Sequence, residues 1–92
     1  MSIDSVVSLF VEGSYKGYER LIRLLIKQGV DVHVCEDGAL RLASEKGHLG
    51  IVRFLLEKGA DVHACDDSAF EWAKRKGHIK VKRLLKEYME QD

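Results

Sequence analysis

The stretch from Gly47 to His63 reads GHLGIVRFLLEKGADVH, and its spacing of apolar residues decides the fold. The apolar side chains fall at positions i, i+1, i+4 and i+5, so they share one stripe of a helix. They are Ile51, Val52, Leu55 and Leu56. Gly47 and Gly59 flank the helix, and glycine favours the left-handed conformation in which helices end. The stretch therefore predicts a turn, an amphipathic helix and a second turn.

The chain repeats itself at an offset of thirty residues. Identical residues recur from Gly29, Asp31, Val32, His33, Cys35, Asp37, Ala39, Ala43, Lys46, Gly47 and His48 to the positions thirty further on. Such self-similarity indicates a repeat architecture. We expect one domain over residues 1–92, with repeat 1 at about 1–28, repeat 2 at about 29–58 and repeat 3 at about 59–92.

Each unit predicts two helices. The first is short, roughly Ala39 to Lys46 in the middle unit and Ala69 to Lys76 in the last, and the second is the amphipathic helix above. Glycine recurs after each first helix, and Asp37 is a candidate helix cap. Each unit is thus helix, turn, helix and short loop.

From Gly47 to His63 the residues resemble the second helix and exit loop of an ankyrin repeat, and the resemblance covers most of the chain. It implies an all-α solenoid of three stacked helix–turn–helix repeats. Two features depart from the family pattern: the Thr-Pro-Leu-His opening is represented by Gly38-Ala39-Leu40-Arg41, and the period is thirty instead of about thirty-three. The missing residues come from the loop that normally projects as a β-hairpin, so shortened inter-repeat loops are expected. This trimmed form is similar to repeats in the ankyrin arrays of giant DNA viruses.

Equivalent positions predict which faces lie at the ends of the stack. One stripe is apolar in the first two units but carries Lys82 and Lys86 in the last, so we expect it to face the following unit. Glu12 and Glu19 stand where later units have apolar residues, and we interpret these positions as facing backwards. The sequence therefore predicts an N-terminal cap, a C-terminal cap and a complete stack.

Composition narrows the function. The 92 residues are 46% apolar and 33% charged, and 15 Lys and Arg balance 15 Asp and Glu. A neutral chain has no global field to attract nucleic acid or an anionic membrane. No apolar run is long enough to span a bilayer, and the first residues lack the basic region of a signal peptide. We expect a cytoplasmic protein, in the host cytoplasm if the chain is viral, with no membrane partner.

The 4 His and 2 Cys invite a metal or redox site. Equivalent residues of stacked units lie about 8–10 Å apart, whereas a disulfide between Cys35 and Cys65 needs Cα atoms within about 7 Å. A single unit offers two ligands, such as His33 and Cys35, and structural zinc takes four. We therefore expect no metal and no cofactor.

The histidines are interpreted as structural. His48 and His78 open the second helices, where an imidazole can satisfy a nearby backbone group. The resemblance implies that His33 and His63 replace an Asn that hydrogen-bonds between neighbouring loops.

No catalytic arrangement is visible. Asp31 beside His33 recurs as Asp61 beside His63, and a pair copied in each unit favours a scaffold role over an active site. The glycines follow the repeat and form no phosphate-binding loop. We expect no enzyme activity.

Trp72 and a basic cluster remain to be interpreted. Trp72 is equivalent to Leu42, which favours packing between units over a binding anchor. The cluster comprises Lys74, Arg75, Lys76, Lys80, Lys82, Arg83 and Lys86. We interpret it as a solvated face, with anionic-ligand or nucleic-acid binding through Lys74–Lys86 as the alternative.

The resemblance implies a non-enzymatic protein–protein interaction module that displays a concave groove of first-helix and loop side chains. The candidate partner-binding residues are Tyr15, Lys16, Arg41, Glu45, Lys46, Glu71, Arg75 and Lys76. The partner is an unknown protein, and a structural or spacer role without a groove ligand is a further alternative. We expect a monomer, with a weak homodimer through Val6, Val7 and Val11 left open.

Overall fold

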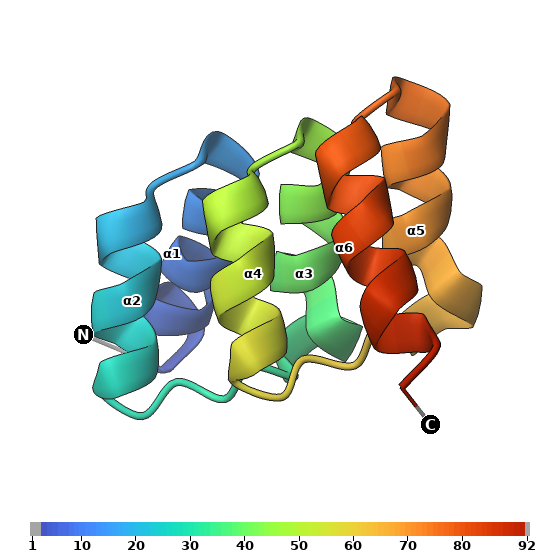
Figure 1. The fold of residues 1–92 in the computed structure, drawn as a ribbon. Helices are drawn as coiled ribbons and strands as arrows, with labels where there is room; N and C mark the ends of the chain where they lie inside the picture. Colours follow the sequence, from blue (N-terminus) through green and yellow to red (C-terminus); the bar gives the residue numbers. More distant parts are fainter. Residues whose placement is uncertain (1–2, 92) are drawn as a thin grey trace.

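Three pairs of antiparallel helices stand side by side in the computed structural model, which describes residues 3–91 (Figure 1). The first helices of the pairs are α1 (Ile3–Lys16), α3 (Val34–Lys46) and α5 (Ala64–Lys76). The second helices are α2 (Glu19–Lys27), α4 (Leu49–Glu57) and α6 (Ile79–Met89). No strand occurs in this part of the chain. The predicted all-α stack of helix–turn–helix units is confirmed.

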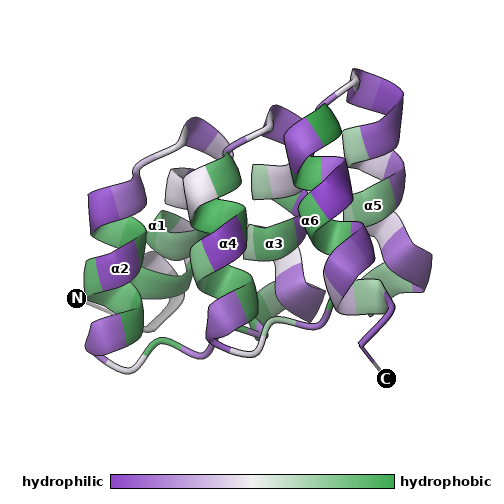
Figure 2. Ribbon diagram, in the orientation of Figure 1, coloured by the Kyte–Doolittle hydropathy of each residue, from purple (hydrophilic) through white to green (hydrophobic). Residues whose placement is uncertain are grey.

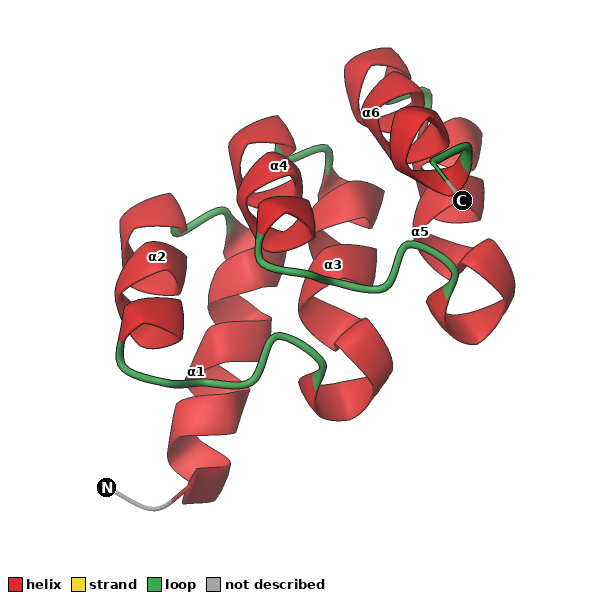
Figure 3. Ribbon diagram, turned by 60° about the horizontal axis from the view of Figure 1, so that its bottom comes forward, coloured by secondary structure: helices red, strands yellow, loops and turns green. Residues whose placement is uncertain are grey.

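The first helices form one layer and the second helices form the other (Figures 1 and 3). Helix α3 packs extensively on α1 and α5, whereas α4 makes fewer contacts with α2 and α6. A stack whose two layers are packed to different degrees curves towards the tighter one. The layer of α1, α3 and α5 is therefore the concave side.

The core lies between the two layers and continues from repeat to repeat (Figure 2). Apolar stripes of α2, α4 and α6 face small residues of the first helices, such as Ala39 and Ala43, which are fully buried. Leu55 at the centre of α4 is also fully buried, and burial of such a side chain contributes about 1.5–3 kcal/mol. Each unit thus shields the apolar flank of its neighbour.

Glycine ends the helices as the sequence predicts. Gly47 and Gly77 have φ values of 77° and 75°, in the left-handed region. The His48 N–H donates to the Ala43 carbonyl at 2.9 Å, and the Gly47 N–H donates to the Ser44 carbonyl at 3.2 Å. These two bonds form the Schellman arrangement, which satisfies the last carbonyls of α3.

The start of each later first helix differs from the prediction. The regular helix runs from about Ala39, as expected, but it is preceded by a left-handed turn at Cys35, Glu36 and Asp37, where φ is 56°, 55° and 58°. The same turn recurs at residues 65–67. Left-handed conformation costs L-residues about 1–2 kcal/mol each, and no sequence pattern indicates it here. These turns occupy the place of the shortened loops.

One prediction about the stack direction is wrong. A Cβ atom added at Gly50 would collide with the Glu19 carboxylate, so Glu19 faces the following repeat and not backwards. Its equivalent Ile79 is 62% exposed in the last repeat. Lys82 is half-buried and Lys86 is exposed.

Candidate functional site

All eight candidate residues lie on the first-helix layer. Tyr15 and Lys16 end α1, whereas the others belong to α3 and α5. Lys46 connects two repeats, because its Nζ lies 4.6 Å from the centroid of the Tyr15 ring. Lys16 pairs with Glu12 at 2.7 Å, and this hydrogen bond lowers the pKa of Glu12. The turn end of this layer thus carries an aromatic ring with one cation, Lys46, against it.

Trp72 is not a core residue, so the predicted packing between units is wrong. Its side chain is 36% exposed on the concave layer. Arg75 Cζ and Lys76 Nζ lie 5.6 Å and 5.8 Å from the centroid of its ring. The buried positions of α5 are Ala69 and Ala73, and position 72 points out beside them. Trp72 therefore forms a second aromatic ring with flanking cations on this layer.

Arg41 and Glu45 also serve the scaffold. Arg41 donates from Nε to the Glu36 carbonyl at 3.2 Å and from Nη2 to the Cys35 carbonyl at 3.1 Å. These bonds clamp the left-handed turn of the second repeat. Glu45 is half-buried, and its backbone carbonyl accepts a hydrogen bond from His78. The third repeat has Glu71 in place of Arg41, so its left-handed turn lacks the guanidinium clamp.

An apolar hollow of about 380 Å³ opens between α1 and α3. It is lined by Val7, Ser8, Val11, Glu12, Tyr15, Cys35 and Leu42. The sequence reading missed it and assigned Val7 and Val11 to a dimer patch. The available signal was the comparison of Val11 with its equivalent Arg41, because a short apolar residue stands where the second repeat has a long charged one.

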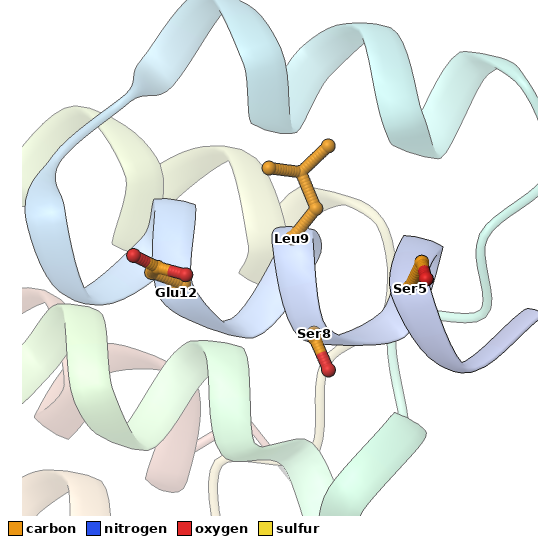
Figure 4. A pocket seen from close by; sticks show the side chains of 4 residues that line it. All are labelled: Ser5, Ser8, Leu9 and Glu12. Atoms are coloured by element: carbon orange, nitrogen blue, oxygen red, sulfur yellow. The ribbon is translucent and has the colours of Figure 1, made fainter. Parts of the chain in front are cut away.

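Two further hollows lie near α1. One, of about 320 Å³, is lined by Val6, Val7, Val34 and the loop that follows α2. The other, of about 360 Å³, is lined by residues of α1 alone: Ser5, Ser8, Leu9 and Glu12 (Figure 4). In Figure 4, Leu9 points towards α2 and Ser8 points away from it. A hollow walled by one helix offers no convergent groups to a ligand.

The two histidines that open second helices connect the repeats. His48 Nε2 donates to the Tyr15 carbonyl at 2.8 Å, and His78 Nε2 donates to the Glu45 carbonyl at 2.9 Å. The structural role predicted for them is confirmed. In the first repeat Tyr18 takes this place and is 51% exposed.

The bond between neighbouring loops comes from Asp37 and not from His33. Asp37 is buried, and its Oδ2 accepts the Asp61 backbone N–H at 2.8 Å. His33 Nδ1 lies 3.0 Å from Asp37 Oδ1, and this bond raises the pKa of His33. Within the third repeat, His63 Nδ1 similarly lies 2.6 Å from Asp67 Oδ1. Asp37 is therefore a link between loops, and its predicted role as a helix cap is wrong.

Cys35 and Cys65 are free and exposed. Cys65 Sγ donates to Glu36 Oε2 at 3.3 Å, and this bond raises the pKa of the Cys65 thiol. Within residues 3–91 no three His, Cys, Asp or Glu side chains are grouped closely enough to hold a metal ion.

The basic cluster lies on α5 and α6. Lys82 is half-buried, whereas Lys74, Lys80, Arg83 and Lys86 are exposed. In the described part of the chain, none of these side chains pairs with a carboxylate. The cluster thus extends from α5, which carries Trp72, to α6, the second helix of the last repeat.

The stacked helix pairs and their histidine bonds define a repeat protein of the helical solenoid class. A family model described as ankyrin repeats (3 copies) matches residues 9–92, and the chain belongs to the ankyrin repeat family. Such repeats generally act as protein–protein interaction modules and are typically non-enzymatic. A search of curated proteins found no match. No helix among the described residues combines the length and apolar character that a membrane span requires.

Proposed function

We propose that this chain is a non-enzymatic protein-binding module whose concave first-helix layer contacts a protein partner. The observation that carries the proposal is the pair of exposed aromatic side chains on this layer, Tyr15 with Lys46 against its ring and Trp72 with Arg75 and Lys76 against its ring. Exposed aromatic residues with neighbouring cations are enriched where proteins bind each other. Three repeats offer a modest face, about 600–800 Å² per partner.

The proposed contact residues combine the sequence prediction with the structure. They are Tyr15, Lys16, Arg41, Glu45, Lys46, Glu71, Arg75 and Lys76, together with Trp72. The exposed, free thiols of Cys35 and Cys65 suit a reducing compartment and support a cytoplasmic location.

The test is a pull-down from the native cell with a groove variant and a matched control. The groove variant reverses charge at four places: Glu45→Lys, Lys46→Glu, Arg75→Glu and Lys76→Glu. The control makes the same net change on exposed residues of the second helices: Arg53→Glu, Glu57→Lys, Arg83→Glu and Lys86→Glu. We expect the groove variant alone to lose its partner. If both variants keep every partner, the chain has a structural or spacer role instead.

A second function is favoured by the exposed, unpaired cations of the basic cluster. Binding of an anionic polymer through Lys74–Lys86 predicts retention on heparin that falls steeply with salt, because each phosphate or sulfate contact releases counterions. The control variant above would weaken this retention, since it reverses Arg83 and Lys86. No retention at low salt excludes this function.

We expect the module to act as a monomer. The half-buried Val6, Val7 and Val11 are the residues through which a second copy would bind. A molecular mass of one chain at high concentration, measured by light scattering, excludes the homodimer.

A further inference from the structure

The hollow between α1 and α3 is lined by two short apolar residues of α1 whose equivalents in the second repeat are charged. Val7 and Val11 line it in the first repeat, whereas the second repeat carries Asp37 and Arg41 at those places. Asp37 is drawn into the loop link, and Arg41 extends to the carbonyls of the left-handed turn. The two short valines, with Leu42 opposite, leave a space walled largely by carbon. Such a space suits one large apolar side chain of a partner.

Cations adjoin the hollow. Tyr15 forms part of its wall, and Lys46 lies over the Tyr15 ring. One repeat further along, Arg75 and Lys76 adjoin the Trp72 ring. These three cations are exposed and pair with no carboxylate within residues 3–91. Because cations already occupy positions against both rings, the groups left for a ligand are N–H donors, which favour carboxylates.

Most acidic side chains of the same layer already have partners. The contacts join Glu12 to Lys16, Glu36 to Cys65, Asp37 to His33 and Asp67 to His63. Glu45 and Glu71 are half-buried. Asp66 is exposed, but it lies in the left-handed turn at the loop end of α5, whereas Arg75 lies at the other end of the helix. The turn end of the concave layer is therefore available mainly to negative charge.

We propose that the concave layer binds an acidic segment of a partner protein, which inserts one large apolar side chain between Val11 and Leu42 and places carboxylates on Lys46, Arg75 and Lys76. This inference rests on the proposed function and specifies the chemistry of the partner. Lys46 and Lys76 occupy equivalent positions one repeat apart, a separation of about 8–10 Å. In an extended segment that distance spans about three residues. The carboxylates should therefore lie beside the apolar anchor and about three residues further along.

The test measures binding of short labelled peptides to the full chain by fluorescence anisotropy. The probe contains a single Phe among Glu residues. One comparison peptide has Lys in place of every Glu, and the other has Ala in place of the Phe. We expect the probe to bind at least about ten-fold more tightly than either comparison peptide. Equal binding of the Glu and Lys peptides, or no binding of the probe, overturns the proposal.

Two variants separate the anchor from the charges. Val11→Arg replaces a short apolar residue of the hollow's wall by a long charged one, the residue that the second repeat carries at this position. We expect it to abolish the preference for Phe over Ala and to retain the preference for Glu over Lys. Lys46→Ala combined with Lys76→Ala should abolish the preference for Glu over Lys and retain the preference for Phe over Ala. Arg53→Ala combined with Arg83→Ala, on the second helices, is the control and should change neither preference.

The two proposals can fail separately. If the groove charge reversals remove a cellular partner but the peptides show no acidic preference, the chain is a binding module with a partner of other chemistry. If Val11→Arg leaves the preference for Phe intact, the hollow is not the anchor site. If neither the pull-down nor the peptides respond to the concave layer, the proposed function fails as well.

Discussion

The close contact between the Gly47 turn and His78 of the next repeat provides the sharpest prediction. A Cβ atom at Gly47 would lie 2.6 Å from His78 Nδ1, whereas a Cβ atom at Gly77 would meet nothing within 4 Å. The backbone is nearly the same at both glycines, with φ and ψ of 77° and 25° at Gly47 and 75° and 22° at Gly77. Gly47→Ala and Gly77→Ala therefore share the backbone cost and differ in the steric contact between repeats.

The magnitudes follow from this comparison. Alanine in the left-handed region costs about 1–2 kcal/mol in each variant. In Gly47→Ala the His78 ring must also move, which breaks its 2.9 Å bond to the Glu45 carbonyl. A lost hydrogen bond of this kind costs about 0.5–1.5 kcal/mol, and overpacking costs about 1–3 kcal/mol. We therefore expect Gly47→Ala to lose about 2–4 kcal/mol more than Gly77→Ala.

The assay is urea unfolding followed by far-ultraviolet circular dichroism, from which the free energy of unfolding is extrapolated. A double-mutant cycle with His78→Ala isolates the contact between repeats. When the ring is absent, Gly47→Ala should cost no more than Gly77→Ala. If the two glycine variants lose the same free energy of unfolding while His78 is present, the close contact between the His78 ring and the Gly47 turn is refuted.

Three further predictions concern the loops. Asp37→Ala should cost about 1–2 kcal/mol more than Asp67→Ala, because Asp37, unlike Asp67, accepts a backbone N–H of the following loop. Chemical denaturation of both variants measures the difference. Equal costs would show that this bond between loops does not stabilise the fold. Because the bond to Asp37 raises the pKa of His33 from 6.5, the stabilisation by this pair is fully present below about pH 6.5 and is lost as pH rises through the folded pKa. His33→Gln should flatten that part of the stability–pH profile, and an unchanged profile contradicts the pairing. Glu71→Arg should supply the missing guanidinium clamp and raise the free energy of unfolding by about 1 kcal/mol, whereas Arg41→Glu should lower it by a similar amount. Thermal unfolding of the two variants measures both changes. A lower stability of Glu71→Arg would show that the clamp does not stabilise the turn.

The sequence determined the repeat, the helix pairs and their order. A thirty-residue period fixes the local structure of every unit, because helix periodicity and turn glycines act over a few residues. It also indicated the role of His48 and His78, since a residue repeated beside a turn has the same neighbour in each unit.

The tertiary structure decided which way the side chains point. Trp72 and Glu19 were assigned from apolar equivalents, but their surroundings depend on which neighbour they face, and a pattern within one unit does not specify that. The left-handed turns at residues 35–37 and 65–67 could not be predicted either, because L-residues rarely adopt positive φ and no sequence pattern indicates it here. The hollow at Val11 likewise depends on how two helices of neighbouring repeats, α1 and α3, pack on each other. Local sequence determines where a helix forms, whereas contacts between adjacent helices determine which of its side chains are buried and which are exposed.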